Sequence, residues 1–348
     1  MEKQSISSCP CCGDKSPEMA FRPDAGARKR FLDLSRKRYG GFMDGWESIL
    51  SLEVLRCGRC AHLWHADCPD QGSLFEMYAA RANMRGRNRA DAGTPAIPGP
   101  VRRHVRTLVR LAPWADGRKP RFLDYGCGYG IWGTAADKAG FEVSCYEPVA
   151  ARQIADTLPN SEIRAIGSLE ELEDGAYDAI NLEQVLEHVS DPVETLRQIR
   201  TFGTSNCIVR ISVPNVPKSQ PGFWDGFPFG GGAHILSPYE HLQGFNGVSL
   251  REAIARAGLK EVGFYGLLKA DLIHGIRRSL VAFAPRLKST TLFARFDTVT
   301  AAKFHVHLKD GIGTCLPGSR SSKKSASVRD SGKGSGGTRG SPPPLHFE

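Results

Sequence analysis

The sequence feature that most constrains the fold is a short apolar run that leads into four glycines within eight residues, in FLDYGCGYGIWG at 122–133. In a parallel α/β sheet the first strand ends at such a turn, where the backbone approaches a ligand beside the next helix. The glycines fit two registers. Gly128, Gly130 and Gly133 have the G-x-G-x-x-G spacing of a dinucleotide site. The second register, D-x-G-x-G-x-G, begins at Asp124 and indicates a different nucleoside cofactor.

Short apolar runs alternate with helical patterns between residues 118 and 268. This alternation predicts an α/β fold in which repeated β-α units surround a Rossmann-like, mostly parallel sheet. Helix starts are predicted at Asp191, which a proline follows, and at Ser249, which has Glu252 three positions later. Gly258 predicts the end of the second helix. Strands are predicted at 121–124, 141–147, 162–166, 177–182, 207–213 and 260–268.

Composition divides the chain of 348 residues into four parts. Residues 1–70 bear most of the cysteines. Residues 71–117 are a predicted linker, in which Gly and Pro interrupt any helix until a leading helix begins near Val101. Residues 118–317 hold the predicted sheet. Residues 318–348 carry six Lys or Arg, two acids and almost nothing to bury, which predicts a disordered tail.

The formal net charge is +9, and part of the excess lies in two basic segments at 28–38 and 81–110. We interpret both segments as solvated surface; the alternative is contact with nucleic acid or an anionic membrane surface. Within 269–317, an amphipathic helix that covers the sheet and a late edge strand are predicted. No run approaches the ~18 apolar residues that span a bilayer, and the N-terminal segment lacks the apolar core of a signal peptide, so we expect a cytoplasmic protein.

Four of the ten cysteines form two C-x-x-C pairs, Cys9 with Cys12 and Cys57 with Cys60. Two such pairs place four thiolates around one Zn²⁺ at ~2.3 Å, in a closed site that is structural rather than catalytic. The 44 residues between the pairs exceed the usual spacing, which predicts a zinc-ribbon-like segment with a basic insert. The alternative is a set of ordinary reduced cysteines. A redox role is disfavoured because neither pair opens a helix after a strand.

Two carboxylates distinguish the possible cofactors. Asp124 sits just before the glycines, where it would repel a pyrophosphate at the helix N-terminus, so it disfavours NAD. S-adenosylmethionine has no phosphate, and a carboxylate at that place accepts hydrogen bonds and organises the loop. Glu147 stands 23 residues later, at the end of the second predicted strand. A carboxylate there binds both ribose hydroxyls of a nucleoside, in NAD and in adenosyl cofactors alike.

The segments LDYGCGYG, YEP, YDAINLEQVLEHVSDPVETL, ISVPN and SPYEHLQGFNGVSLREAIARAGL together resemble the class I S-adenosylmethionine-dependent methyltransferases. Within that superfamily they resemble the branch of ubiquinone-type and bacterial small-molecule enzymes, some of which carry an N-terminal zinc-binding segment. The resemblance implies a seven-stranded, mostly parallel sheet. Adenine packing is implied near 166–169, although the family often has an acid at Gly167 or Ser168. The residues implied to bind S-adenosylmethionine are Asp124, Gly126, Gly128, Gly130, Glu147, Gly167, Ser168, Leu182 and Glu183.

Methyl transfer is an in-line displacement at an activated methyl group, so the protein contributes alignment and, for an OH acceptor, removal of a proton. His188, after the fourth predicted strand, is the predicted base because imidazole titrates near neutrality, and Glu187 is the second predicted catalytic residue. The alternative is that both side chains only tie the helix to neighbouring backbone. The pair resembles the metal-binding E-x-x-E-H of some relatives, but Gln184 occupies the position of the first acid.

The loop at 222–245, after the fifth predicted strand, is a candidate for lining the acceptor site. Its histidines and aromatic residues are equally compatible with a surface and packing role. The side chains concerned are His234, His241, Trp224, Phe227 and Phe229.

The sequence therefore predicts methyl transfer from S-adenosylmethionine to a small molecule, such as a sugar nucleotide, a lipid-linked metabolite or a secondary metabolite, with O- or C-methylation. An RNA methyltransferase is the nearest alternative, because of the cysteine pairs and the basic insert. Against it, the chain lacks an N-P-P-[FY] motif, and the aromatic residues near the Arg-rich run form no stacking platform. A non-catalytic zinc-ribbon binding protein and an NAD-dependent oxidoreductase are further alternatives.

Overall fold

The computed structural model of the chain describes residues 3–39, 45, 50–86, 96–112, 117–149, 158, 162–216, 223–225, 233–238, 240–262 and 289–296. The predicted tail at 318–348 lies outside these residues, as does the predicted amphipathic helix after residue 269. Across the described ranges, no helix is both long enough and apolar enough to cross a bilayer.

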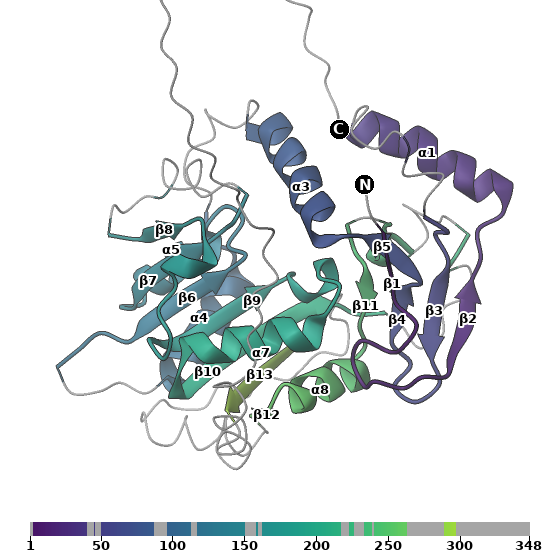
Figure 1. Ribbon diagram of the computed structural model, residues 1–348. Coiled ribbons are helices and arrows are strands. Elements are labelled where there is room, and N and C mark those ends of the chain that lie inside the picture. Colours follow the sequence, from purple (N-terminus) through teal and green to yellow (C-terminus); the bar gives the residue numbers. More distant parts are fainter. Residues whose placement is uncertain are drawn as a thin grey trace, which may run out of the picture. The chain divides into compact units, whose positions relative to one another are not determined.

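The large sheet has seven strands in the order β12-β13-β10-β9-β6-β7-β8 (Figure 1). Strands β10, β9, β6, β7 and β8 pair in parallel, whereas β13 runs antiparallel to both β10 and β12. The mostly parallel, Rossmann-like α/β fold predicted from the alternating pattern is therefore confirmed. The strands are β6 Arg121–Tyr125, β7 Glu142–Tyr146, β8 Arg164–Ile166, β9 Tyr177–Glu183, β10 Gly203–Pro214, β12 Leu259–Glu261 and β13 Ser289–Phe296.

The central strands are buried on both faces, because successive side chains point to opposite sides of the sheet. Leu123 of β6 packs in one apolar cluster with Leu196, which lies on helix α7 (Pro192–Phe202). Its neighbour Phe122 packs in a second cluster with Leu108 of helix α4 (Gly99–Leu111) and Ala136 of helix α5 (Ile131–Asp137). Helices thus cover both faces, and the carboxyl ends of the parallel strands meet at one edge.

Helix starts follow the capping chemistry, with one correction. Asp191 caps α7 through a hydrogen bond from the Glu194 amide, as predicted. Helix α8 (Gly247–Arg256) has its cap three residues before the predicted one, since the Asn246 side chain accepts from the amides of Val248 and Ser249. Ser249 occupies the third helical position instead, where its hydroxyl accepts from the Asn246 amide in a reciprocal capping box. The prediction of Ser249 as the cap was wrong because it overlooked this Asn.

Two small sheets lie in the N-terminal part of the chain. One has the order β11-β4-β3-β2, and the other pairs β1 with β5. Strand β11 follows β10 of the large sheet in the chain, yet it pairs antiparallel with β4. The four-stranded sheet therefore combines N-terminal strands with one strand from much later in the sequence. The strands are β1 Lys3–Ser5, β2 Pro17–Phe21, β3 Val54–Cys57, β4 Leu63–His65, β5 Asp67–Pro69 and β11 Gln243–Gly244.

Two helices occupy segments in which no helix was predicted. Helix α1 (Ala25–Tyr39) lies in the basic insert between the cysteine pairs, and helix α3 (Gln71–Gly86) lies in the predicted linker. Asp70 caps α3, because its carboxylate accepts from the Ser73 amide and hydroxyl. Leu74 and Met77 bury the apolar face of α3. The sequence signal for α3 is a capping Asp followed by two apolar residues three positions apart. Glycines and prolines further along the linker obscured this signal.

Candidate cofactor and acceptor site

The glycine loop connects β6 to α5 and requires left-handed backbone at three positions. Gly126, Gly128 and Gly130 have φ angles of +71°, +53° and +68°. A Cβ on Gly126 would lie 2.8 Å from Val185 Cγ2, so the loop packs directly against the segment that follows β9. A Cβ on Gly133 would collide with Cys145 Sγ on β7, so this glycine allows α5 to pack on the sheet. The positive φ angles thus fall on the three glycines of the second register, and Gly133 has a packing role.

Asp124 is buried at the end of β6 and organises this loop. One carboxylate oxygen accepts from the Gly133 amide at 3.0 Å, and the other accepts from Asn181 Nδ2 at 2.8 Å. Burial raises the pKa of Asp124 to about 6, and the two hydrogen bonds limit the rise. The Asp124 carboxylate therefore connects β6 to β9 and to the first turn of α5, at the end of the glycine loop. It accepts hydrogen bonds, as expected from the sequence.

Glu147 follows β7 and faces the same loop. Its Oε2 accepts from the Gly128 amide at 3.1 Å, and burial raises its pKa. Ser168 follows β8 and caps a short 3₁₀ turn, η2 (Leu169–Glu171), by accepting from the Glu170 amide. The chain after β8 therefore turns at the position where the resemblance implies adenine packing. Glu147, Gly167 and Ser168 all follow strands at the carboxyl edge of the sheet, where Glu147 contacts the glycine loop.

A buried arginine lies beneath this edge and was missed from the sequence. Arg210 on β10 is 1% exposed, and its Nη1 donates to Asn181 Oδ1 at 2.8 Å and to Glu183 Oε2 at 2.6 Å. Burial lowers the pKa of Arg210, while Glu183 and Asp124 oppose that change. The signal was a lone charge inside the apolar strand CIVRISV at 207–213, because a buried charge requires partners.

Helix α4 also contributes to this network. The Arg210 guanidinium lies 3.8 Å from the centre of the Trp132 ring, on which His104 of α4 stacks. His104 Nδ1 lies 3.2 Å from Arg210 Nη2, and burial lowers the pKa of His104 to about 4. The neutral imidazole therefore accepts from the guanidinium. Leu182 at the end of β9 is fully buried, and Glu183 beside it forms an ion pair with Arg210.

Beyond β9, a short 3₁₀ turn, η3 (Leu186–His188), carries both predicted catalytic residues. Glu187 is fully buried, and within the described chain neither of its carboxylate oxygens has a hydrogen-bond partner. Burial raises its pKa to about 8. Glu187 Oε1 lies 4.0 Å from His188 Nε2, and the ligand atoms of Glu187, His188 and His241 all lie within 4.8 Å of one another.

The segment before β11 and helix α3 complete this cluster. The His188 and His241 rings meet edge to face, with centroids 4.7 Å apart. Tyr78 of α3 places its hydroxyl 2.7 Å from His188 Nδ1 and donates to the Glu240 carbonyl at 2.9 Å. His241 Nδ1 lies 3.0 Å from the Ile235 carbonyl. The structure thus brings together Glu187, His188 and His241, and adds Tyr78, which the sequence analysis did not identify.

The aromatic residues predicted for the acceptor loop separate from this cluster or lie outside the described chain. Trp224 stacks on Phe21 of β2, with ring centroids 4.7 Å apart, inside an apolar cluster of the N-terminal sheet. Trp224 therefore has the packing role that was the alternative to lining the acceptor site. Phe227, Phe229 and the side chain of His234 lie outside the described residues.

Comparison with known proteins identifies the main domain. Residues 100–262 match the model of a family described as a methyltransferase domain. This region, a little under half of the chain, is therefore similar to a methyltransferase domain. This match includes the glycine loop, Glu147 and the turn η3, and it leaves the cysteine pairs and Tyr78 outside. Among curated proteins, none matches the sequence.

Several solved structures are similar to this chain at low identity. The 1,6-didemethyltoxoflavin-N1-methyltransferase of Burkholderia thailandensis is 15% identical with a TM-score of 0.43, over 69% of this chain and 98% of its own. A putative O-methyltransferase of Nostoc punctiforme is 17% identical with a TM-score of 0.42, over 78% and 72%. A TehB-like S-adenosylmethionine-dependent methyltransferase of Corynebacterium glutamicum is 19% identical with a TM-score of 0.39, over 64% and 99%. These similarities carry no argument about the substrate.

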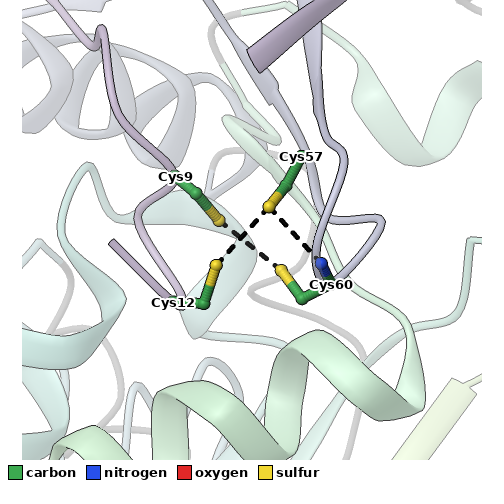
Figure 2. A group of neighbouring side chains, drawn as sticks. All are labelled: Cys9, Cys12, Cys57 and Cys60. Carbon is green, nitrogen blue, oxygen red and sulfur yellow. Dashed lines mark hydrogen bonds between the residues drawn. The ribbon is translucent and has the colours of Figure 1, made fainter. Parts of the chain in front are cut away.

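The two cysteine pairs converge in the N-terminal part of the chain. Figure 2 shows the four side chains pointing toward a common centre. The Sγ atoms of Cys9 and Cys60 lie 3.6 Å apart, and those of Cys12 and Cys57 lie 3.4 Å apart. All four are buried, and their sulfurs lie within 4.8 Å of one another. A tetrahedral metal with ~2.3 Å bonds needs sulfurs about 3.8 Å apart, so the geometry fits one Zn²⁺.

The two histidines near the cysteines form hydrogen bonds with other protein groups. His62 Nε2 bonds Gln243 Oε1 at 2.8 Å, and His65 Nε2 bonds the Leu236 carbonyl at 3.0 Å. The cysteine loop is also held by the methyltransferase domain, because Asn246 Nδ2 donates to the carbonyls of Cys60 and Ala61. The four thiols are therefore the ligand set that this geometry favours.

Proposed function

We propose that this methyltransferase methylates a small molecule whose acceptor group binds beside Glu187 and His188. The observation that carries the proposal is the buried, unpartnered Glu187 carboxyl facing two imidazoles, on the segment that packs against the glycine loop through Val185. A buried carboxyl without a partner is costly, and a polar group of the acceptor would satisfy it. Such residues with perturbed pKa values mark candidate functional sites.

The residues at the carboxyl edge of the sheet fit an adenosyl cofactor. The glycine backbone leaves room for close approach, and Glu147 presents a half-buried carboxylate suited to two ribose hydroxyls. When bound, S-adenosylmethionine supplies a methyl group already activated by a sulfonium. The proposed binding set, which the geometry supports as one edge of the sheet, is Asp124, Gly126, Gly128, Gly130, Glu147, Gly167, Ser168, Leu182 and Glu183.

For a hydroxyl acceptor, we infer that His188 Nε2 takes the proton while the oxygen forms its bond to the methyl carbon. The products are the methylated acceptor, S-adenosylhomocysteine and an imidazolium that returns its proton to water. Glu187, whose raised pKa leaves it largely protonated near neutrality, donates a hydrogen bond to the acceptor. Alignment supplies most of the remaining rate enhancement.

A small acceptor is supported by how deeply the cluster lies. Glu187 is fully buried and the His188 side chain is 28% exposed, with the Tyr78 hydroxyl in contact with His188 and with the Glu240 carbonyl. A recessed cluster of this kind suits a ligand that enters a pocket. A base within an RNA chain would have to be extruded to reach it.

We further propose that Cys9, Cys12, Cys57 and Cys60 bind one structural Zn²⁺ in the zinc-ribbon-like segment 1–70. The convergence of four buried sulfurs supports this assignment. Metal analysis of protein purified without chelator should find about one zinc per chain. A metal-free, fully folded protein would overturn the assignment.

Two measurements test the methyl-transfer proposal. Calorimetric titration should show binding of S-adenosylhomocysteine and none of NAD⁺; binding of NAD⁺ alone would contradict it. Tritiated-methyl transfer from S-adenosylmethionine into fractionated cell extract should label a compound of low molecular mass. Label confined to RNA would replace the small-molecule acceptor by the alternative.

A further inference from the structure

The geometry points to Tyr78 as the residue that positions His188 for proton removal, so that the N-terminal part of the chain completes the acceptor site of the methyltransferase domain. This inference rests on the proposed function. Tyr78 lies 110 residues before His188 in sequence and outside the residues that match the family model.

Helix α3 holds Tyr78 in place from the N-terminal side. It follows β5 directly, and its capping Asp70 fixes the first turn. Leu74 and Met77 pack in one cluster with residues of the N-terminal segment and with Leu242, which follows His241 in the chain. Tyr78 comes one residue after Met77, and the same cluster packs against it. The side chain therefore reaches His188 from a helix with an anchored buried face.

The hydrogen bonds at His188 define its tautomer. Nδ1 contacts the Glu240 carbonyl oxygen, and a carbonyl oxygen only accepts, so Nδ1 carries a proton. The Tyr78 hydroxyl donates its own proton to the same carbonyl. Its oxygen then faces Nδ1 at 2.7 Å as a second acceptor. With the proton fixed on Nδ1, the lone pair of Nε2 points toward Glu187, on the side where an acceptor would bind.

Three titratable side chains contact His188 in the described chain, and the Glu240 segment contributes its backbone carbonyl. Tyr78 approaches from α3, Glu187 from η3, and His241 from the segment before β11. Of these, only the Tyr78 hydroxyl combines contact with Nδ1 and an anchor on the Glu240 carbonyl. An acceptor at Nδ1 stabilises the imidazolium, so its loss lowers the pKa of His188 and weakens the base.

Tyr78→Phe tests the inference, because it removes one hydroxyl and retains the ring that packs edge to face on His188. The full chain is labelled with ¹⁵N-histidine and saturated with S-adenosylhomocysteine. Long-range ¹H–¹⁵N spectra across a pH series then report each tautomer and pKa, with His188 assigned by His188→Gln. In the unsubstituted protein we expect the Nδ1–H tautomer. In Tyr78→Phe we expect the pKa of His188 to fall by about 0.5 unit or more.

Phe75→Ala is the matched control, since Phe75 lies on the same helix and is exposed. It should leave the His188 signals unchanged. Coincident His188 tautomer and pKa in the unsubstituted protein and Tyr78→Phe would overturn the inference. The spectra need no methyl acceptor, so this outcome is distinct from failure of the proposed function, which would appear as absent methyl transfer.

A kinetic cycle gives the second readout, with the compound labelled in the extract experiment as acceptor. Tyr78→Phe should lower kcat about tenfold, leave the KM for S-adenosylmethionine unchanged, and move the acidic limb of the pH profile to lower pH. In the His188→Gln background the same substitution should have no further effect on kcat. Equal effects in both backgrounds would show that Tyr78 does not act through His188.

Discussion

Two buried carboxyls, Asp124 at the cofactor edge and Glu187 beside the acceptor site, differ in how the chain satisfies them. Asp124 accepts hydrogen bonds from a backbone amide and from Asn181, and its pKa rises only to about 6. Glu187 has no such donor among the described residues, and its pKa rises to about 8. The first carboxyl is a structural element of the loop. The second is a polar group that the fold leaves available for a ligand.

The same contrast extends to the residues around each carboxyl. The cofactor edge is built from strand ends and one loop, and backbone amides of Gly128 and Gly133 donate to its two carboxylates. The acceptor side is assembled from α3, η3 and the segment before β11, which are distant in sequence. Substitutions at the two sites should therefore separate cofactor binding from methyl transfer.

The largest effect is expected from disrupting the cysteine cluster. Cys57→Ser should lose the zinc and destabilise the N-terminal sheet by several kcal/mol, on the order of what structural zinc contributes to small domains. Methyl transfer should fall more than affinity for S-adenosylhomocysteine. The reason is a chain of contacts: His62 holds Gln243, whose amide donates to the carbonyls of Val189 and Ser190, just after His188. Thermal unfolding and calorimetric titration measure the two quantities.

Cys11→Ala is the matched control for that experiment. Cys11 is a buried neighbour that does not belong to the converging group. It should keep its zinc and most of its stability. If Cys57→Ser lost cofactor affinity and methyl transfer equally, the separation of the two sides would be wrong.

Arg210→Met tests the cofactor side and should have the next largest effect. It leaves Glu183 and Asn181 without their buried donor, which costs about 3–5 kcal/mol of stability. Arg251→Met is the control, because its ion pair with Glu261 is exposed and should be worth less than about 1 kcal/mol. Urea unfolding compares the two variants. Similar losses from both would show that the buried network contributes no more than a surface pair.

Glu147→Gln should weaken S-adenosylhomocysteine binding about 10- to 100-fold, because one hydrogen-bond acceptor for the ribose becomes a donor. Glu142→Gln is the control: Glu142 lies at the exposed start of β7, the strand that Glu147 follows, and its substitution should leave the affinity unchanged. Calorimetric titration measures both dissociation constants. An unchanged affinity in Glu147→Gln would remove Glu147 from the proposed cofactor set.

The smallest effect concerns the pH dependence of stability. The pKa of Glu187 rises from its ordinary 4.5 to about 8 in the folded chain, so the folded state binds this proton more tightly than the unfolded state. Its contribution to stability is therefore present at low pH and is lost as pH rises between those two values. Glu187→Gln should be more stable than the unsubstituted chain at pH 8 by about 1–2 kcal/mol, and closer to it at pH 5.

Glu194→Gln, on the surface of α7, is the control for this comparison and should show no such trend. Urea unfolding at the two pH values supplies the free energies. A Glu187→Gln variant that loses stability equally at both would mean that Glu187 has partners in the folded chain.

Sequence reasoning grouped the glycine loop, Asp124 and Glu147 because their signals are local. The positive-φ glycines, Asp124 and Glu147 lie within 24 residues of one another, and strand pairing in parallel brings their segments together. It missed α3 because glycines and prolines further along the linker obscured the Asp70 cap. It missed Tyr78 because contact with His188 depends on packing across 110 residues, which no spacing rule encodes. The domain boundaries, the roles of the site residues and the location in the cell stay predictions.

The measurement that tests the account most directly is tritiated-methyl transfer into cell extract by the unsubstituted chain and by His188→Gln, each first shown to bind S-adenosylhomocysteine. The account predicts that the unsubstituted chain labels a compound of low molecular mass. It predicts that His188→Gln binds the cofactor product with the same affinity and transfers at least ~100-fold less label. Equal labelling by both proteins, or label confined to RNA, would contradict it.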